Sequence, residues 1–182
     1  MISHMTLKTR IGEVWVGSTP SGLFWVNLGA VDSSAVEGFF EGRREQGQEV
    51  AFQRGGDLIE RAGHELQLYL EGRLTRFTGR LDLSGTTAFS RKVWRVTRKI
   101  PFGQVRTYAW VAEKVGEPQS VRAVGRALGR NPVPIFVPCH RVVGSGGWLG
   151  GFSAGLSIKR WLLALESGQK RLDLGSLEAM GK

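Results

Sequence analysis

Cys139 is the only cysteine in this 182-residue chain, and it limits how the fold can be held together. One thiol cannot close an intramolecular disulfide, and it cannot build a zinc site from several thiolates. The three histidines, His4, His64 and His140, are scattered without the spacing of metal ligands. We therefore expect no metal and no other cofactor. The fold must depend on a hydrophobic core, for which 41% hydrophobic residues suffice.

Positive charge is concentrated in the second half of the chain. The net charge is +9. Residues 1–84 hold 9 Lys and Arg against 11 Asp and Glu, whereas residues 85–182 hold 16 against 5. The second half therefore predicts a polyanionic partner, most commonly nucleic acid. A solvated basic surface, or one that meets acidic lipid, is the alternative.

The same residues indicate where the protein works. No apolar run reaches the length of a membrane span, and the N-terminus lacks the charged-then-apolar pattern of an export signal. With a single unpaired thiol, we expect a cytoplasmic protein.

The first half predicts a small α/β domain over residues 1–84. Residues 5–29 alternate as strands around a turn at 18–22, which indicates an antiparallel hairpin of two or three strands. Residues 32–46 and 57–71 have helical spacing, and Asp57 is a candidate cap for the second helix. A turn-rich stretch at 81–88 is the expected domain boundary.

The second half predicts a mostly helical domain over residues 85–168, followed by a loose tail at 169–182. Helices are expected at 89–100, at 107–115 with Thr107 as cap, at about 118–128 and at 158–166. The second and third form a helix-turn-helix, which resembles a winged-helix DNA-binding unit. Residues 132–143 read as an extended segment that leads to the cysteine.

Cys139 is a candidate nucleophile because His140 follows it directly. A nearby base raises the population of the reactive thiolate. Glu166 is the candidate for orienting the histidine, since it is the only acid between Cys139 and Asp173. A buried, inert cysteine remains the alternative from these residues alone.

The motif Pro138-Cys139-His140-Arg141-Val142, with its flanks from Asn131 to Val143, resembles the active-site segment of the O6-alkylguanine-DNA alkyltransferases. The similarity covers residues 89–168. It includes Pro101-Phe102-Gly103 before the motif, and 150–153, Lys159 and 161–166 after it. The resemblance implies DNA repair in a single turnover, in which an alkyl group moves irreversibly from a flipped-out guanine to the cysteine.

The resemblance also implies roles for individual residues. Cys139 would accept the alkyl group, His140 would act as its base through a water, and Glu166 would fix the imidazole. Asn131 would brace the turn, and Tyr108 would donate a proton to the base. The implied substrate pocket comprises Val142, Trp148, Gly150, Phe152 and Ser153.

The implied DNA-binding helix would enter the minor groove of double-stranded DNA, with Arg122 filling the vacated stack. The protein would act as a monomer. The other DNA-binding residues implied are Thr107, Ser120, Ala123, Gly125, Arg126 and Arg130.

Two features depart from the family pattern. Phe152 replaces a tyrosine that many relatives have, and Trp148 adds bulk to the pocket loop. Two other functions are alternatives: a binder of alkylated DNA that does not react, and a Cys-His-Glu hydrolase of esters or amides. The retained cysteine counts against the first, and the helix-turn-helix with its basic charge counts against the second.

Overall fold

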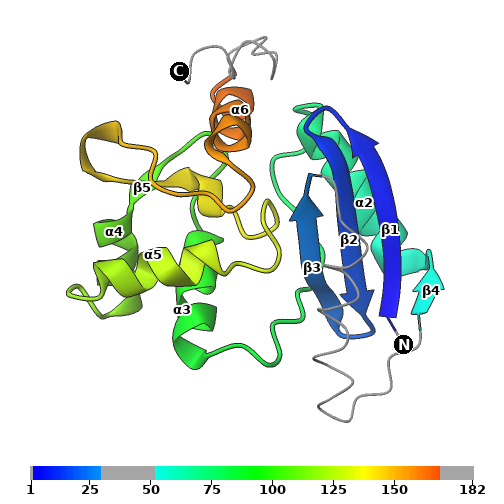
Figure 1. Ribbon diagram of the computed structural model, residues 1–182, viewed down its shortest axis with the longest axis horizontal. Helices are drawn as coiled ribbons and strands as arrows, with labels where there is room; N and C mark the ends of the chain where they lie inside the picture. The colour runs from blue at the N-terminus through cyan, green and yellow to red at the C-terminus, as the bar shows by residue number, and fades with distance from the viewer. Residues whose placement is uncertain (1, 30–51, 169–182) are drawn as a thin grey trace. The chain divides into compact units, whose positions relative to one another are not determined.

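The computed structural model describes residues 2–29 and 52–168, which form two compact units, residues 1–82 and 83–182 (Figure 1). Each unit is described by itself. The helix expected at 32–46 and the tail expected at 169–182 lie outside the described residues. The division of the chain after residue 84 stays a prediction.

The first unit is a sheet with one helix packed on it. Strands β1 (Ile2–Thr9), β2 (Gly12–Thr19) and β3 (Gly22–Leu28) are antiparallel, and β4 (Phe52–Arg54) pairs in parallel with β1. The strand order is β3-β2-β1-β4. The antiparallel strands expected over residues 5–29 are thereby confirmed, with a third strand present.

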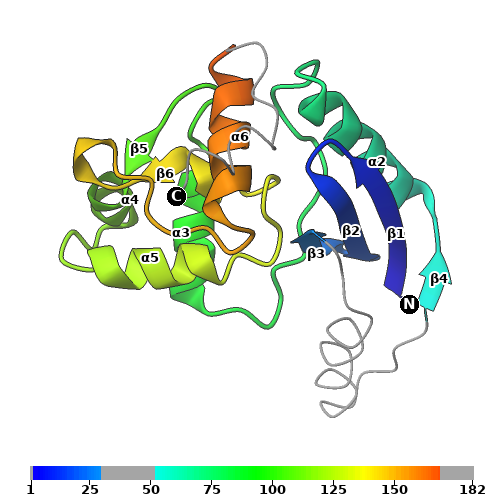
Figure 2. The same ribbon diagram turned by 45° about the horizontal axis from the view of Figure 1, so that its top comes forward.

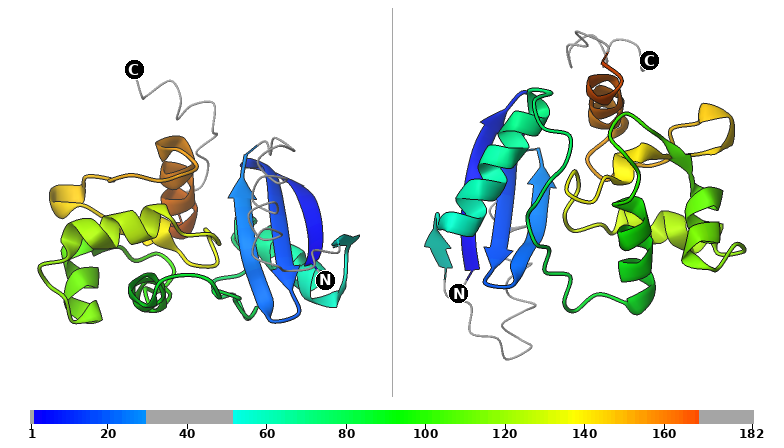
Figure 3. Two further views of the ribbon diagram at one scale, coloured as in Figure 1. Left: turned by 60° about the horizontal axis from the view of Figure 1, so that its bottom comes forward. Right: turned by 180° about the vertical axis from the view of Figure 1, so that it is seen from behind.

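Helix α2 (Asp57–Leu70) lies against one face of this sheet (Figure 3, right). Its apolar stripe is buried, and Gly63 lets the helix approach β1 closely, since a Cβ there would come within 2.6 Å of the Met5 sulfur. The expected cap was wrong by one position. Gly56 occupies the N-cap and Asp57 is the first helical residue, so its side chain is not the cap.

The second unit is helical and contains the expected helix-turn-helix. Helices α4 (Tyr108–Val115) and α5 (Val121–Gly129) pack on α3 (Ala88–Thr97), and the Trp94 indole NH donates to the Ala127 carbonyl across α3 and α5. Thr107 caps α4 as predicted, because its hydroxyl accepts from the Trp110 amide. Helix α5 begins three residues later than expected, so Pro118 lies in the turn.

A short pair of parallel strands connects two segments of this unit that are distant in the sequence. Strand β5 (Arg106–Thr107) pairs with β6 (Val142–Val143), which places the start of α4 beside the segment that follows the cysteine (Figure 2). Helix α6 (Leu156–Glu166) begins two residues before the expected start and ends at Glu166. In the described part of the chain, no helix is long and apolar enough to cross a membrane.

The extended segment expected at 132–143 was wrong in its middle. Ile135 has a positive φ of 74°, the Val137 amide donates back to the Val133 carbonyl, and Cys139–Arg141 form a 3₁₀ turn. The prolines in this stretch suit such tight turns, because each fixes φ and removes a donor. The chain is therefore folded back, and not straight, where it reaches the cysteine.

Candidate active site

Cys139 is the first residue of the 3₁₀ turn, and this matters for its neighbour. In a strand, the side chains of Cys139 and His140 would point to opposite faces of the sheet. The turn Cys139–Arg141 removes that restriction. Both residues are buried, with Cys139 6% exposed and His140 fully enclosed.

Asn131 ties this turn together. Its side-chain amide nitrogen donates to the Val137 carbonyl at 2.9 Å and lies 3.1 Å from the Cys139 sulfur. Its side-chain oxygen accepts from the Val133 amide at 3.0 Å. One side chain therefore bridges the start and the end of the loop that presents the cysteine, and it also contacts the sulfur directly.

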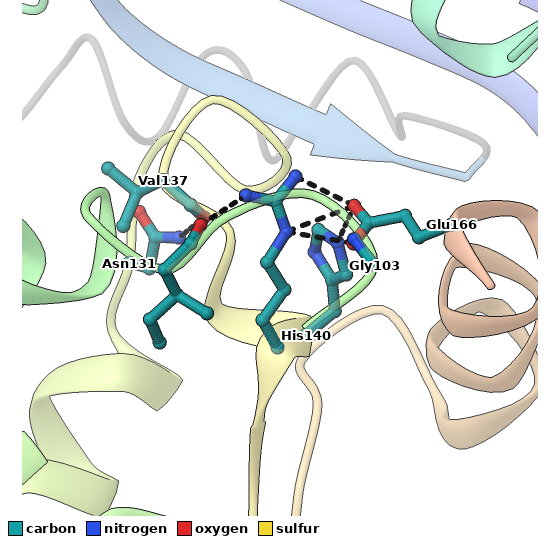
Figure 4. Close-up of polar contacts among 7 residues, drawn as sticks. Gly103, Asn131, Val137, His140 and Glu166 are labelled. Carbon is teal, nitrogen blue, oxygen red and sulfur yellow. Dashed lines mark hydrogen bonds and ion pairs between the residues drawn. The ribbon is translucent and has the colours of Figure 1, made fainter. Parts of the chain in front are cut away.

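His140 and Glu166 form a buried pair. The Nε2 atom of His140 lies 2.8 Å from Oε1 of Glu166, and the two side chains face each other at the end of α6 (Figure 4). Glu166 comes from a segment 26 residues later in the chain, and the helix end places it beside the turn. The sequence placed these residues in one site, and the structure brings them together.

Arg141 and Gly103 complete the surroundings of this carboxylate. The Arg141 guanidinium donates to both Glu166 oxygens at 2.8–3.1 Å and to the Ile100 carbonyl at 2.7 Å. The Gly103 amide donates to Oε2 of Glu166 at 3.1 Å (Figure 4). A carboxylate with so many donors is strongly favoured in its ionised form.

The electrostatics of the pair fix the state of the imidazole. Hydrogen bonds from His140 and Arg141 outweigh burial and lower the pKa of Glu166 to about 2. Burial lowers the pKa of His140 below its usual 6.5, although Glu166 opposes this. The histidine is therefore neutral at pH 7. Because an ionised carboxylate only accepts, the proton sits on Nε2 and the lone pair on Nδ1.

The resting cysteine is a thiol. Burial raises the pKa of Cys139, while the Asn131 amide, the Lys159 charge and two backbone amides lower it in part. The net direction is upward, so the sulfur keeps its proton at neutral pH. A base is then required to form the nucleophile, which is what the neutral imidazole of His140 can supply.

A pocket of about 370 Å³ leads from the surface to Cys139. Its walls come from α5 on one side and from the loop after β6 on the other. The lining residues are Tyr108, Val121, Gly125, Leu128, Gly129, Cys139, Trp148, Gly151 and Phe152. The buried sulfur is therefore accessible from outside to a ligand that fits this largely apolar pocket.

Tyr108 lines this pocket, and its hydroxyl lies against the loop that follows β6, at Gly150 and Gly151. A Cβ on Gly150, which has a φ of 69°, would come within 2.3 Å of the Tyr108 oxygen, so only glycine allows this approach. Desolvation raises the pKa of Tyr108, and the nearby Cys139 raises it further, against a backbone hydrogen bond from Gly151. The phenol keeps its proton and can donate it.

Lys159 is a buried cation that we did not include among the candidate site residues. Its ammonium donates to the carbonyls of Val142 at 2.7 Å, of Leu149 and of Gly151. It therefore joins β6 to the pocket loop. Desolvation lowers the pKa of Lys159 to about 8, and the Cys139 charge opposes this. The family resemblance includes Lys159, but it gave the residue no role and did not indicate that it is fully enclosed.

Not every predicted pocket residue lines the cavity. Trp148 and Phe152 do, whereas Val142 is buried behind it, Gly150 is enclosed against Tyr108, and Ser153 is exposed at the surface. The basic residues predicted to bind DNA, Arg122, Arg126 and Arg130, are exposed on or just after α5. Ser120, Ala123 and Gly125 lie on the same helix or at its start.

Comparison with known proteins identifies the family of this chain. The family model for the 6-O-methylguanine DNA methyltransferase DNA-binding domain matches residues 88–168. A methylated-DNA–protein-cysteine methyltransferase from Methanosarcina acetivorans is 36% identical over 163 residues, which cover 90% of this chain and 97% of that protein. The chain belongs to the methylated-DNA–protein-cysteine methyltransferase family. An inducible family member from Bacillus subtilis is 38% identical over 84% of this chain and 83% of its own length.

Solved structures of this methyltransferase family share the fold. The Mycobacterium tuberculosis OGT structure in complex with DNA is 34% identical, with a TM-score of 0.78 over 97% of this chain and 99% of that one. A Pyrococcus kodakaraensis O6-methylguanine-DNA methyltransferase is 29% identical, with a TM-score of 0.68 over 91% and 99%. The family resemblance and the predicted α/β fold are therefore confirmed.

Proposed function

We propose that this protein repairs O6-alkylguanine in DNA by moving the alkyl group irreversibly to Cys139. The observation that carries the proposal is the juxtaposition of a reachable cysteine with a buried His140–Glu166 pair, on a unit that contains a helix-turn-helix. A curated relative that is 36% identical is named for this activity. Each molecule reacts once, as the family resemblance implies.

The first step is proton removal from the Cys139 thiol. His140 accepts this proton at Nδ1, through a bridging water as the family resemblance implies, and Glu166 holds Nε2–H. The Glu166 carboxylate stabilises the imidazolium that forms, because its hydrogen bond to Nε2 and its negative charge both favour the protonated ring. Asn131 and the Lys159 charge stabilise the thiolate, since both lower the pKa of the sulfur.

The second step is in-line displacement at the alkyl carbon. The sulfur–carbon bond forms while the bond between that carbon and guanine O6 breaks, and the electron pair passes to the base. Tyr108 donates its proton to a ring nitrogen, which neutralises the leaving guanine. The proton held by His140 balances the one given by Tyr108, so the net change is S–H to S–alkyl in the protein and alkylguanine to guanine in the DNA.

Guanine is read mainly by the backbone in this proposal. The carbonyls of Cys139 and Val142 accept from the exocyclic amine. Lys159 supports this reading because it donates to the Val142 carbonyl, which keeps a second lone pair for the substrate. Phe152 and Trp148 form the wall of the pocket on the side of the loop after β6, and Gly150 lets this loop approach Tyr108.

The DNA is held by α5 in the minor groove, and the target nucleotide is flipped out of the duplex. Arg122 fills the vacated stack, while Arg126 and Arg130 contact phosphates. The DNA backbone passes close to four further residues, Thr107, Ser120, Ala123 and Gly125. The small side chains of α5 support this, because they allow a groove to approach. The protein acts as a monomer in the cytoplasm, where a free thiol persists.

The proposal is tested on the DNA product. A duplex with one O6-methylguanine is incubated with increasing protein, and the bases are then separated and quantified. We expect guanine to replace O6-methylguanine in an amount equal to the protein added. Cys139→Ala should bind the same duplex without converting it, and Leu156→Ala, a surface change on α6, should match the native protein. Conversion that exceeds the protein, or none by the native chain, contradicts the proposal.

A further inference from the structure

Trp148 is unusually exposed for a residue of its size. Its exposed fraction is 70%, and the other large apolar side chains that are exposed in residues 2–29 and 52–168 are Val105, Val121 and Leu156, at 36–46%. Of these four, Trp148 and Val121 line the pocket above Cys139. Exposed apolar surface at a pocket mouth marks a place where a ligand docks.

The loop that carries Trp148 is built to hold its indole ring in place. The Gly144 amide donates to the Trp148 carbonyl at 2.6 Å, which closes the loop from Gly144 to Trp148. A Cβ on Gly144 would come within 2.5 Å of the indole, so the ring rests directly on the backbone there. Gly146 and Gly147 have positive φ values of 70° and 84°, which allow the tight return.

The pocket has an aromatic edge. Trp148 and Phe152 stand on the loop side, and α5 supplies the other wall through Val121, Gly125 and Leu128. Exposed aromatic rings at a pocket favour a ligand with a flat, apolar face that can stack on them. Because Cys139 is 6% exposed and Trp148 70%, the sulfur lies deep in the pocket and the indole at its mouth.

We propose that Trp148 captures the extruded guanine by stacking its indole on the face of the base. The inference rests on the proposed function and adds a residue that binds the substrate base. The contact is made to the nucleobase and not to the duplex. Trp148 therefore contributes equally whether the alkylguanine comes as a nucleoside, in a single strand or in a duplex, whereas Arg122 contributes only in the duplex.

The expected size follows from stacking of bases on aromatic side chains. Removing such a platform weakens binding of one base by about 5- to 150-fold. The loss belongs to binding, because the indole carries no group that titrates near neutral pH and can exchange a proton in the transfer. The limiting rate of transfer should therefore stay unchanged. A phenylalanine at this position keeps a ring in the loop and should retain most of the affinity.

The experiment is single-turnover transfer from O6-methyldeoxyguanosine, a single-stranded oligonucleotide and a duplex, each over a range of concentrations. Trp148→Ala should raise the half-saturating concentration by one common factor of about 5–150 on all three, with the limiting rate unchanged. Trp148→Phe should lie near the native protein. Leu156→Ala, an exposed apolar side chain away from the pocket, is the matched control, and melting temperatures confirm that each variant folds.

Three results overturn the inference. An unchanged half-saturating concentration in Trp148→Ala would show that the indole does not stack on the base. A loss confined to the duplex shows that Trp148 contacts DNA and not the base. A lower limiting rate at unchanged half-saturation assigns the residue to the chemical step. If the native protein transfers nothing from any substrate, the proposed function itself fails, and that outcome is distinct from the other three.

Discussion

The Nε2 atom of His140 lies 2.8 Å from Oε1 of Glu166, and the two side chains are 0% and 1% exposed. A neutral histidine and an ionised carboxylate in this geometry leave Nδ1 as the basic nitrogen. The buried thiol of Cys139 has a raised pKa, so it needs that base. The chemistry of the site therefore depends on a pair of residues from two segments that the helix end of α6 brings together.

Replacing His140 with alanine should change the pH profile of transfer. In the native protein the rate should be flat around neutrality and fall only as pH drops through the pKa of His140, which lies below 6.5. Without the base, the rate should follow thiolate formation and rise with pH through the pKa of Cys139, which lies above 9.0. Single-turnover rates from about pH 5 to about pH 10 test this. Two profiles of the same shape would refute the role of His140.

Glu166→Gln should destabilise the fold by about 3–5 kcal/mol, because it leaves the Arg141 charge buried without its anion. Urea unfolding near neutral pH measures this. Glu71→Gln is the matched control: it removes the partner of an exposed arginine, Arg73, and should cost less than about 1 kcal/mol. Equal effects of the two substitutions would show that the buried pair adds no stability.

Protonation of Glu166 should also make the free energy of unfolding depend on pH in the acidic range. Its pKa is lowered in the folded state, from 4.5 to about 2. Its contribution is fully present above pH 4.5 and is lost as pH falls toward 2. The linkage amounts to about 3 kcal/mol. Unfolding free energies at several acidic pH values should therefore fall more steeply for the native protein than for Glu166→Gln, and parallel slopes would contradict the account.

The sequence predicted the parts of the site that one contiguous motif carries. Cys139 and His140 are adjacent, and Glu166 was found because acids are scarce after the cysteine. The strands, α2, and the helix-turn-helix followed from periodicity and caps such as Thr107. These features are local, which is why sequence reasoning reached them.

Long-range contacts were not predictable in the same way. Helical spacing does not mark Lys159 as buried, yet the Val142 carbonyl and two carbonyls of the pocket loop enclose it. The Gly103 amide reaches Glu166 across 63 residues. The 3₁₀ turn at Cys139 was missed because apolar residues between prolines also fit a strand. Ser153 was assigned to the pocket by resemblance, but it is exposed and does not line it.

Lys159→Met should raise the pKa of the Cys139 thiol further, because the ammonium charge that lowers it is removed. Cys139 is the only cysteine, so the pH dependence of its reaction with iodoacetamide reports on this thiol alone. Lys99→Met, on the exposed surface after α3, is the control and should leave the profile unchanged. An unshifted profile in Lys159→Met would exclude an electrostatic role for the lysine.

Arg122→Ala should slow repair in a duplex far more than transfer from the nucleoside, because only a duplex has a stack to fill. Comparison of single-turnover rates on the two substrates gives the answer. If Arg122→Ala impairs both substrates equally, the arginine does not replace the extruded base.

Arg126→Ala should instead weaken binding to any DNA sequence. The salt dependence of its affinity should become shallower by the equivalent of about one phosphate contact.

The most direct test of the central claim is the mass of the protein after reaction with DNA that contains O6-methylguanine. We predict that every active molecule gains one methyl group in place of the thiol proton, and that the peptide with Cys139 carries it. An unchanged mass with tight DNA binding, or methyl found on another residue, would contradict the assignment of Cys139 as the acceptor.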